Sequence, residues 1–174
     1  ALTITVDGLA PQRPTMDLVL DSGLSAVDNV TNAANDVEFA VTAEATPHHL
    51  TLTEERVAVP SKKAKADSNA KVNPPLRGKE DVESIKEGLK NSTIDIIATD
   101  HAPHEGTSKD VEFDIATFGI SGIETAFSLS LSLVREGVLK LSELLWKFTV
   151  NPAKLLGLPY GQIAVGKIAD LTIF

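Results

Sequence analysis

The feature that most constrains the fold is a short apolar run that ends in a cluster of polar side chains. Residues 94–98 read Ile-Asp-Ile-Ile-Ala, interrupted only by Asp95. A run of this kind is typical of a parallel strand that is buried on both faces. Three amphipathic helices are predicted around it, over residues 80–89, 122–135 and 141–148. Strands that alternate with helices predict an α/β fold with a parallel sheet.

The remaining elements are predicted from shorter patterns. Two strands, at residues 16–20 and 39–46, flank a weakly helical spacing at residues 25–36, which together form a β-α-β unit. Polar loops are expected over residues 61–70 and 106–114, and a last strand over residues 168–174.

A short helix is also expected from Asn151 onward. Pro152 suits its first position and Gly157 the position just after its end.

Composition narrows the functional classes. The chain of 174 residues has no cysteine, which excludes disulfides and thiolate metal sites. Its 16 basic against 24 acidic residues give a net charge of -8, which argues against nucleic acid as a partner. No apolar run approaches the roughly 20 residues of a membrane span, and the first residues show no signal-peptide pattern. We therefore expect one soluble, cytoplasmic domain.

The chemistry is expected where the apolar run ends, in Ala98-Thr-Asp-His-Ala-Pro-His104. Functional groups of parallel α/β folds collect at the carboxyl ends of strands. Asp100, His101 and His104 could bind a divalent metal, move a proton or hold an anionic substrate. The structural alternative is a capped strand end with histidines on the surface.

Two further polar clusters have equally good structural explanations. In Thr46-Pro-His-His-Leu50, adjacent histidines of an extended chain point in opposite directions, so packing or hydrogen bonding is the expected role of each. In Lys71-Val-Asn-Pro-Pro-Leu-Arg77, two prolines stiffen the backbone and would fix the direction of the Asn73 amide. A proline-rich loop before a helix fits this segment as well.

In order and spacing, four segments are similar to the last strands of bacterial-type dihydroorotases. They are Val41-Thr-Ala-Glu-Ala-Thr-Pro-His-His-Leu, Lys71-Val-Asn-Pro-Pro-Leu-Arg, Thr93-Ile-Asp-Ile-Ile-Ala-Thr-Asp-His-Ala-Pro-His and Phe118-Gly-Ile-Ser-Gly-Ile-Glu-Thr-Ala. The tail from Gly161 resembles the return of an amidohydrolase barrel to its small β domain. The resemblance implies the C-terminal part of a (β/α)8 TIM-like barrel, incomplete as given. Allantoinases and hydantoinases, which share this plan, are the alternative within the superfamily.

The resemblance divides the chain into three parts. Residues 1–40 are a poorly matched N-terminal segment, for which a β-α unit of the barrel is one interpretation. Residues 41–160 carry the C-terminal barrel strands, helices and active-site loops, and residues 161–174 form the return strand.

The resemblance also implies a reaction and its residues. The family interconverts dihydroorotate and N-carbamoyl-L-aspartate in pyrimidine biosynthesis with one or two divalent metal ions, usually zinc. Asp100 matches a metal ligand that is also the catalytic acid–base group. Asn73 and His104 match substrate-binding residues, with His104 on the substrate carboxylate. Phe118 and Gly119 match a stretch whose backbone contacts the ring. His101 is a residue of the same motif with a less clear role, and a packed side chain is expected for it.

The sequence departs from the family where most of the metal ligands belong. It has no His-x-His, its four histidines lie at positions 48, 49, 101 and 104, and Asp21 stands near the place of a histidine ligand. Thr117 stands where the family usually has proline. Because one carboxylate cannot hold the metal centre, this chain alone is expected to be inactive.

Three explanations of that departure remain open. The chain is a fragment of a longer enzyme, an inactive homologue that supports aspartate transcarbamoylase, or one part of a barrel that another chain completes. A homo-oligomer or a partner that supplies the rest of the barrel is expected, because a half barrel leaves open sheet edges.

Overall fold

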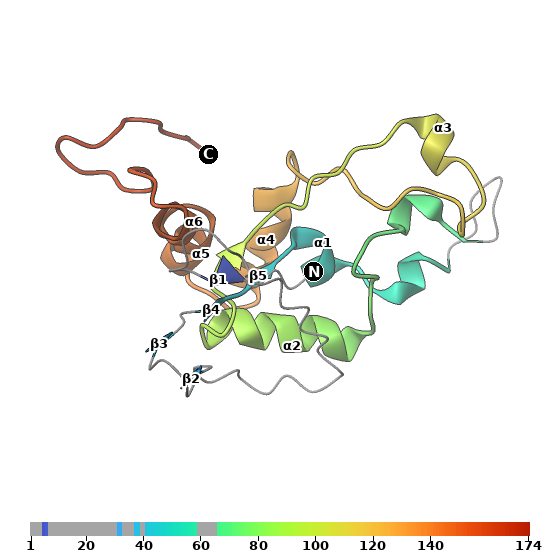
Figure 1. Cartoon of the computed structure of the whole chain (residues 1–174), viewed down its shortest axis with the longest axis horizontal. Helices are drawn as coiled ribbons and strands as arrows, with labels where there is room; N and C mark the ends of the chain where they lie inside the picture. The colour runs from blue at the N-terminus through green and yellow to red at the C-terminus, as the bar shows by residue number, and fades with distance from the viewer. Residues whose placement is uncertain (1–4, 7–30, 33–36, 39–40, 59–65) are drawn as a thin grey trace.

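The computed structural model describes residues 5–6, 31–32, 37–38, 41–58 and 66–174 (Figure 1). Its central feature is a pair of parallel strands, β5 (Glu44–Ala45) and β6 (Ile96–Ile97), with Glu44 opposite Ile96 and Ala45 opposite Ile97. Both residues of β6 are buried. The predicted buried parallel strand within residues 94–98 is therefore confirmed.

Four further strands, within residues 5–42, pair antiparallel. β1 (Thr5–Val6) pairs with β4 (Val41–Thr42), and β2 (Thr31–Asn32) pairs with β3 (Val37–Glu38).

Three predictions fall wholly or partly on this region. The strand expected over residues 39–46 is present as β4 and β5, with Ala43 between them. The helix expected over residues 25–36 is wrong at β2, where Thr and Asn are poor helix formers that a weak apolar spacing does not outweigh. The rest of that stretch and the strand at residues 16–20 lie outside the described residues.

The predicted helices are present, one with the predicted bounds (141–148) and the others with shifted ends. They are α2 (Lys79–Lys90), α4 (Ala126–Arg135), α5 (Leu141–Phe148) and α6 (Val150–Leu155). The Asp81 carboxylate accepts a hydrogen bond from the Gly78 amide at 3.1 Å, which caps α2. Because α6 begins at Val150, Pro152 is its third residue and not its first as predicted. Gly157 follows the C-cap with φ +64°, as expected for this position.

The main apolar core joins the two parallel strands to the helices around them. It contains the buried residues Ala45, Leu50, Leu89, Ile94, Ile97, Leu133, Leu139 and Leu144. Three leucines at its centre, one each from α2, α4 and α5, have no exposed surface. Burying one such side chain stabilises a fold by roughly 1.5–3 kcal/mol. A separate small cluster, Ala70, Val72 and Leu76, is formed by the proline-rich loop itself and the residue before it.

The C-terminal segment after α6 has no strand. It runs as an extended trace beyond α6 with exposed Ile163, Val165 and Ile173 side chains (Figure 1). Its last residue, Phe174, returns to α4, where its ring centroid lies 4.7 Å from that of Phe127. The strand predicted over residues 168–174 is therefore wrong for this chain. A strand needs a neighbour to pair its backbone, and no described strand borders this segment. Within the part of the chain that the structure describes, no helix is long and apolar enough to cross a membrane.

Candidate active site

The site is built at the carboxyl end of β6. The ladder continues one step past the strand, where the Ala98 amide donates to the Ala45 carbonyl at 3.0 Å. Asp100 then adopts φ +46°, a left-handed conformation that Asp tolerates better than most residues. This conformation turns the chain out of the strand, and the exposed Asp100 side chain lies where the sheet meets solvent.

A second segment runs parallel to the first beyond the strand. His101 forms a parallel bridge with Ile120, and the Ala102 amide donates to the Ile120 carbonyl at 3.0 Å. The His101 Nδ1 atom accepts from the Gly122 and Ile123 amides at 3.0 and 3.2 Å. An accepting Nδ1 leaves the ring proton on Nε2.

Two sequence predictions change at this contact. His101 is exposed and holds backbone amides, whereas the sequence indicated a packed side chain. The helix predicted from residue 122 begins later, at Ala126, and the amides of residues 122 and 123 lie before it, bound by His101.

Gly119 brings this second segment against His104. It has φ +138°, which side-chain-bearing residues rarely adopt. A Cβ atom at this position would lie 2.5 Å from the Ala102 carbonyl oxygen and 2.9 Å from the His104 Cδ2 atom. Gly119 and His104, which sequence reasoning assigned separately to substrate binding, therefore lie side by side.

Two buried lysines join the proline-rich loop to the same segment. Lys109, at the end of α3 (Gly106–Lys109), donates from Nζ to the carbonyls of Thr117 and Gly119, each at 2.9 Å. Its pKa is lowered by burial and by the nearby charge of Lys71. Lys71 places its ammonium group 4.4 Å from the ring centroid of Phe118, a cation–π contact. The turn α3 lies inside the stretch that was predicted as a polar loop.

His49 links the end of β5 to the proline-rich loop. Adjacent His48 and His49 lie in α1 (Pro47–Thr51), so the extended geometry expected for them is wrong, while the expected packing and hydrogen bonding are found. His49 Nδ1 lies 2.6 Å from Thr46 Oγ1, and Nε2 lies 2.9 Å from the Pro74 carbonyl oxygen. A carbonyl only accepts, so Nε2 carries the proton and Nδ1 accepts from the Thr46 hydroxyl.

The electrostatics of this histidine connect it to the site. Burial lowers the pKa of His49, while the bond to the Pro74 carbonyl and the negative charge of Asp100 oppose that shift. The negative charge of Asp100 therefore acts on His49, whose ring binds the carbonyl of Pro74, the residue next to Asn73. His48 is buried, and its Nε2 atom has no hydrogen-bond partner among the residues that the structure describes. Burial together with His49 lowers its pKa to about 4.

The five predicted site residues thus belong to connected segments. Asn73 and Phe118 have exposed side chains, and the Asn73–Pro74 peptide bond is cis. The Gly119 amide donates to the Lys71 carbonyl at 2.9 Å, which ties the 118–119 segment to the loop of Asn73. No contact between Asp100 and Asn73 joins them directly among the described interactions. Sequence reasoning missed Lys109, because a lysine within a polar stretch carries no signal of burial.

The described residues do not complete a metal centre. Over residues 41–58 and 66–174, and the shorter described stretches, no three His, Asp or Glu side chains are grouped to hold an ion. Asp100 would supply one ligand only.

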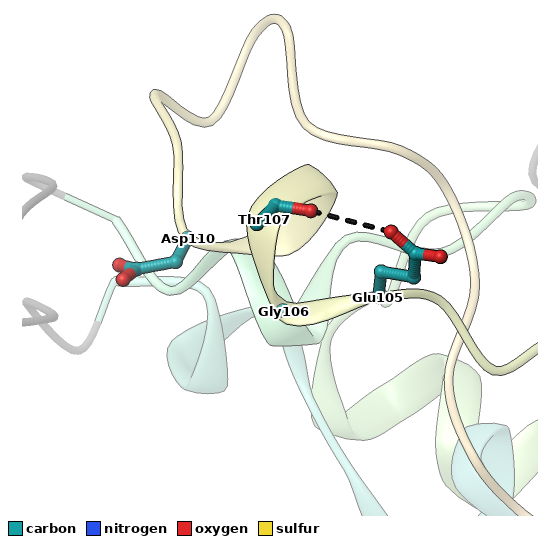
Figure 2. A pocket seen from close by; sticks show the side chains of 4 residues that line it. All are labelled: Glu105, Gly106, Thr107 and Asp110. Carbon is teal, nitrogen blue, oxygen red and sulfur yellow. Dashed lines mark hydrogen bonds between the residues drawn. The ribbon is translucent and has the colours of Figure 1, made fainter.

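A shallow hollow at α3 lies apart from these residues. Its lining residues are Glu105, Gly106, Thr107 and Asp110. Figure 2 shows the Thr107 hydroxyl directed at the Glu105 carboxylate, 3.5 Å away, with Asp110 on the other side of the turn. The two carboxylates do not converge, and the hollow adds nothing to the Asp100 site.

Similarity to known proteins identifies the family. Residues 21–174 match the model of the amidohydrolase family. The chain belongs to the amidohydrolase family. It is 53% identical over 133 residues to the dihydroorotase of Syntrophus aciditrophicus (strain SB), covering 76% of this chain and 30% of that protein. It is also 53% identical over 135 residues to the dihydroorotase of Ruminiclostridium cellulolyticum, again covering 30% of it.

Solved structures of amidohydrolases share the fold. The dihydropyrimidinase from Brevibacillus agri NCHU1002 superposes with a TM-score of 0.67 at 26% identity, over 72% of this chain and 28% of that one. The L-hydantoinase from Arthrobacter aurescens gives a TM-score of 0.62 at 30% identity, over 72% and 28%. The chain therefore spans about 30% of the length of the relatives that it matches. Amidohydrolases are generally metal-dependent hydrolases.

Proposed function

We propose that this chain is the C-terminal part of a dihydroorotase, which interconverts dihydroorotate and N-carbamoyl-L-aspartate in pyrimidine biosynthesis. One observation carries the proposal: Asp100 follows the end of a buried parallel strand, and His104 in the same segment lies against Gly119. Relatives about 50% identical over this part of the chain bear that name, which supports the proposal. The finer fold assignment, the end of a (β/α)8 barrel, belongs to the same proposal.

Asp100 is proposed as the acid–base group. Hydrolysis of the ring amide adds water to the carbonyl carbon and breaks its bond to nitrogen. One proton must leave the water and one must reach the departing nitrogen. A single carboxylate can carry both transfers if it faces the reacting atoms. The exposed position of Asp100 at the strand end is compatible with this role.

Binding of the substrate is proposed to use two faces of the site. His104 would meet the substrate carboxylate through a charge-assisted hydrogen bond. The backbone of Phe118 and Gly119 and the amide of Asn73 would meet the ring. The contact of His104 with Gly119 supports this, since it places the anion-binding side chain beside the ring-binding backbone.

Zinc is proposed as the metal of the complete enzyme, with Asp100 as one ligand. The described residues do not fit a whole zinc site, so no catalytic step is assigned to zinc here. The other ligands would come from the rest of the enzyme, and Asp21, outside the described residues, remains a proposed substitute for one histidine. The 174-residue chain alone is expected to be inactive for this reason.

The exposed apolar side chains are proposed to be covered when the barrel is complete. Trp146, Leu156 and Ile163 are among the large apolar residues left open to solvent. We propose that they pack against the rest of the enzyme or against another protomer. An inactive subunit beside aspartate transcarbamoylase is the alternative, which the turnover measurement below tests.

The test compares two substrates on the full-length protein with zinc supplied. Dihydrouracil is dihydroorotate without its carboxylate. We expect dihydroorotate to have the higher kcat/KM. His104→Ala should lose about 10- to 100-fold on dihydroorotate and little on dihydrouracil. Equal losses would contradict the carboxylate contact, a preference for dihydrouracil would indicate a dihydropyrimidinase, and no turnover would favour the inactive subunit.

A further inference from the structure

One buried ammonium group joins the segments that are proposed to hold the substrate. We propose that Lys109 is a positioning residue for the dihydroorotate site, which fixes the backbone on both sides of Phe118. The inference rests on the proposed function only in naming dihydroorotate as the substrate. Its structural content, a clamp on residues 117–119, stands on the contacts of the lysine.

The contacts of Lys109 converge on two segments. Its side chain is only 7% exposed, and Nζ donates to the Thr117 and Gly119 carbonyls at 2.9 Å each. These two carbonyls belong to the residues immediately before and after Phe118. A third, longer contact of 3.4 Å reaches the Lys71 carbonyl, in the proline-rich loop. An ammonium group has three N–H donors, so the three carbonyls match its capacity.

Packing alone does not explain a lysine at this position. An unpaired buried charge is costly, and an apolar side chain of similar length would fill the space without that cost. Hydrogen bonds from a charged donor are shorter and about twice as strong as neutral ones. The lysine therefore contributes mainly a fixed arrangement of three carbonyl groups.

The clamp is itself held in place. The Lys109 carbonyl accepts a hydrogen bond from the Ser68 hydroxyl. Hydrogen bonds therefore hold both the backbone and the ammonium group of Lys109. The Gly119 amide donates to the Lys71 carbonyl, which closes the loop between the two segments. The position of Gly119 in turn determines how closely His104 lies against it. Loss of the ammonium group would therefore loosen Phe118 and Gly119, and with them His104, which is proposed to bind the substrate carboxylate.

Lys147 offers a matched control at the other end of β6. It is 5% exposed, and its Nζ donates to the Ile94 carbonyl at 2.5 Å. Burial lowers its pKa as it does that of Lys109. It lies in α5, on the side of the strand away from Asp100. A lysine-to-methionine change removes the same buried charge at both positions, but only one of them contacts the site segments.

The experiment uses the full-length protein with Lys109→Met and Lys147→Met. Steady-state kinetics give KM and kcat for dihydroorotate, and hydrogen exchange reports the amides of residues 117–120. We expect Lys109→Met to raise KM about 10-fold, with a smaller fall in kcat, and to speed exchange at the Gly119 amide. Lys147→Met should change the melting temperature by a similar amount, with KM and that exchange as in the wild type.

The outcomes separate this inference from the proposed function. Wild-type protein without turnover contradicts the proposed function, while faster exchange in Lys109→Met still supports the clamp. Unchanged exchange at residues 117–120, or the same change of KM in both variants, overturns the inference. If Lys109→Met does not fold, Lys109→Gln replaces it, because its amide keeps two donors. There we expect about a 3-fold rise in KM with faster exchange, and wild-type values of both overturn the clamp.

Discussion

The two ends of β6 are stabilised in different ways. At one end the helices α2, α4 and α5 pack an apolar core of leucine, isoleucine and alanine side chains. At the other end the site lobe, residues 67–77 and 98–122, has only a small apolar cluster of three residues. Its buried residues also include the polar or charged side chains Asp67, Ser68, Lys71 and Lys109. Hydrogen bonds to backbone carbonyls and the Arg56–Asp67 ion pair, 2.6 Å long, connect that lobe.

This difference separates stability from geometry. Apolar packing is non-directional, so it stabilises the core without fixing the position of any polar atom. Buried polar contacts add less net stability but fix distances and angles closely. We expect mutations in the core to change the free energy of unfolding and mutations in the site lobe to change substrate binding.

The largest effect on stability is expected in the core. Leu133 has no exposed surface and lies where α4 meets the parallel strands. Leu133→Ala should lower the free energy of unfolding by about 3–4 kcal/mol, through lost burial and the cavity left behind. Denaturant titration of the full-length protein measures this, with KM for dihydroorotate as control. A change in KM without a loss of stability would break the distinction between the two lobes.

A pH-dependent effect of intermediate size is expected at α1. The pKa of His48 is lowered from 6.5 to about 4, mainly by burial. As the pH falls below 6.5 the unfolded chain takes up a proton that the folded chain does not, so stability falls until the pH reaches about 4. The loss should be about 3 kcal/mol.

The measurement compares unfolding free energies of wild type and His48→Gln between pH 8 and pH 4. The glutamine variant should lose less stability over the acidic part of this range, while the two curves should run parallel above pH 7. Identical slopes throughout would contradict the burial of a neutral His48.

A smaller stability effect, together with weaker substrate binding, is expected at Gly119. Gly119→Ala should cost about 1–2 kcal/mol of stability from its left-handed backbone and raise KM about 10-fold, since a Cβ atom would displace Ala102 or His104. Gly137→Ala is the matched control, with φ +73° and nothing within 4 Å of the added carbon. It should lower stability by about 1 kcal/mol with an unchanged KM. Equal effects on KM would show that Gly119 matters only for its conformation.

The sequence predicted those elements whose signals are local. The apolar run at residues 94–98 and the amphipathic pattern of α2 need only periodicity and composition, and both are present. The strand expected over residues 168–174 failed because strand formation depends on a neighbouring strand, which no local pattern specifies.

The candidate site was predictable in its residues but not in its connections. Asp100 and His104 could be selected by their place after a buried strand and by family resemblance. That His49 bonds the Pro74 carbonyl and that Lys109 binds three carbonyls depends on contacts between residues 8 to 38 positions apart in the chain. Such contacts leave no trace in residue type, because lysine and histidine occur far more often on surfaces.

The most direct test of the account replaces Asp100 by Asn in the full-length protein. Asparagine tolerates the left-handed backbone at φ +46° as well as aspartate does, so the variant removes the charge without disturbing the turn. Asp95→Asn is the control, since Asp95 lies at the other end of the strand and accepts a hydrogen bond from the Ala43 amide at 3.1 Å. The measurement is kcat for the hydrolysis of dihydroorotate and for the reverse cyclisation of N-carbamoyl-L-aspartate, with substrate affinity determined separately. We predict at least about a 1,000-fold loss of kcat for Asp100→Asn with affinity within about 3-fold of wild type, and near wild-type kcat for Asp95→Asn. Turnover of Asp100→Asn at a rate close to that of the wild type would contradict the central claim that Asp100 is the acid–base group of this site.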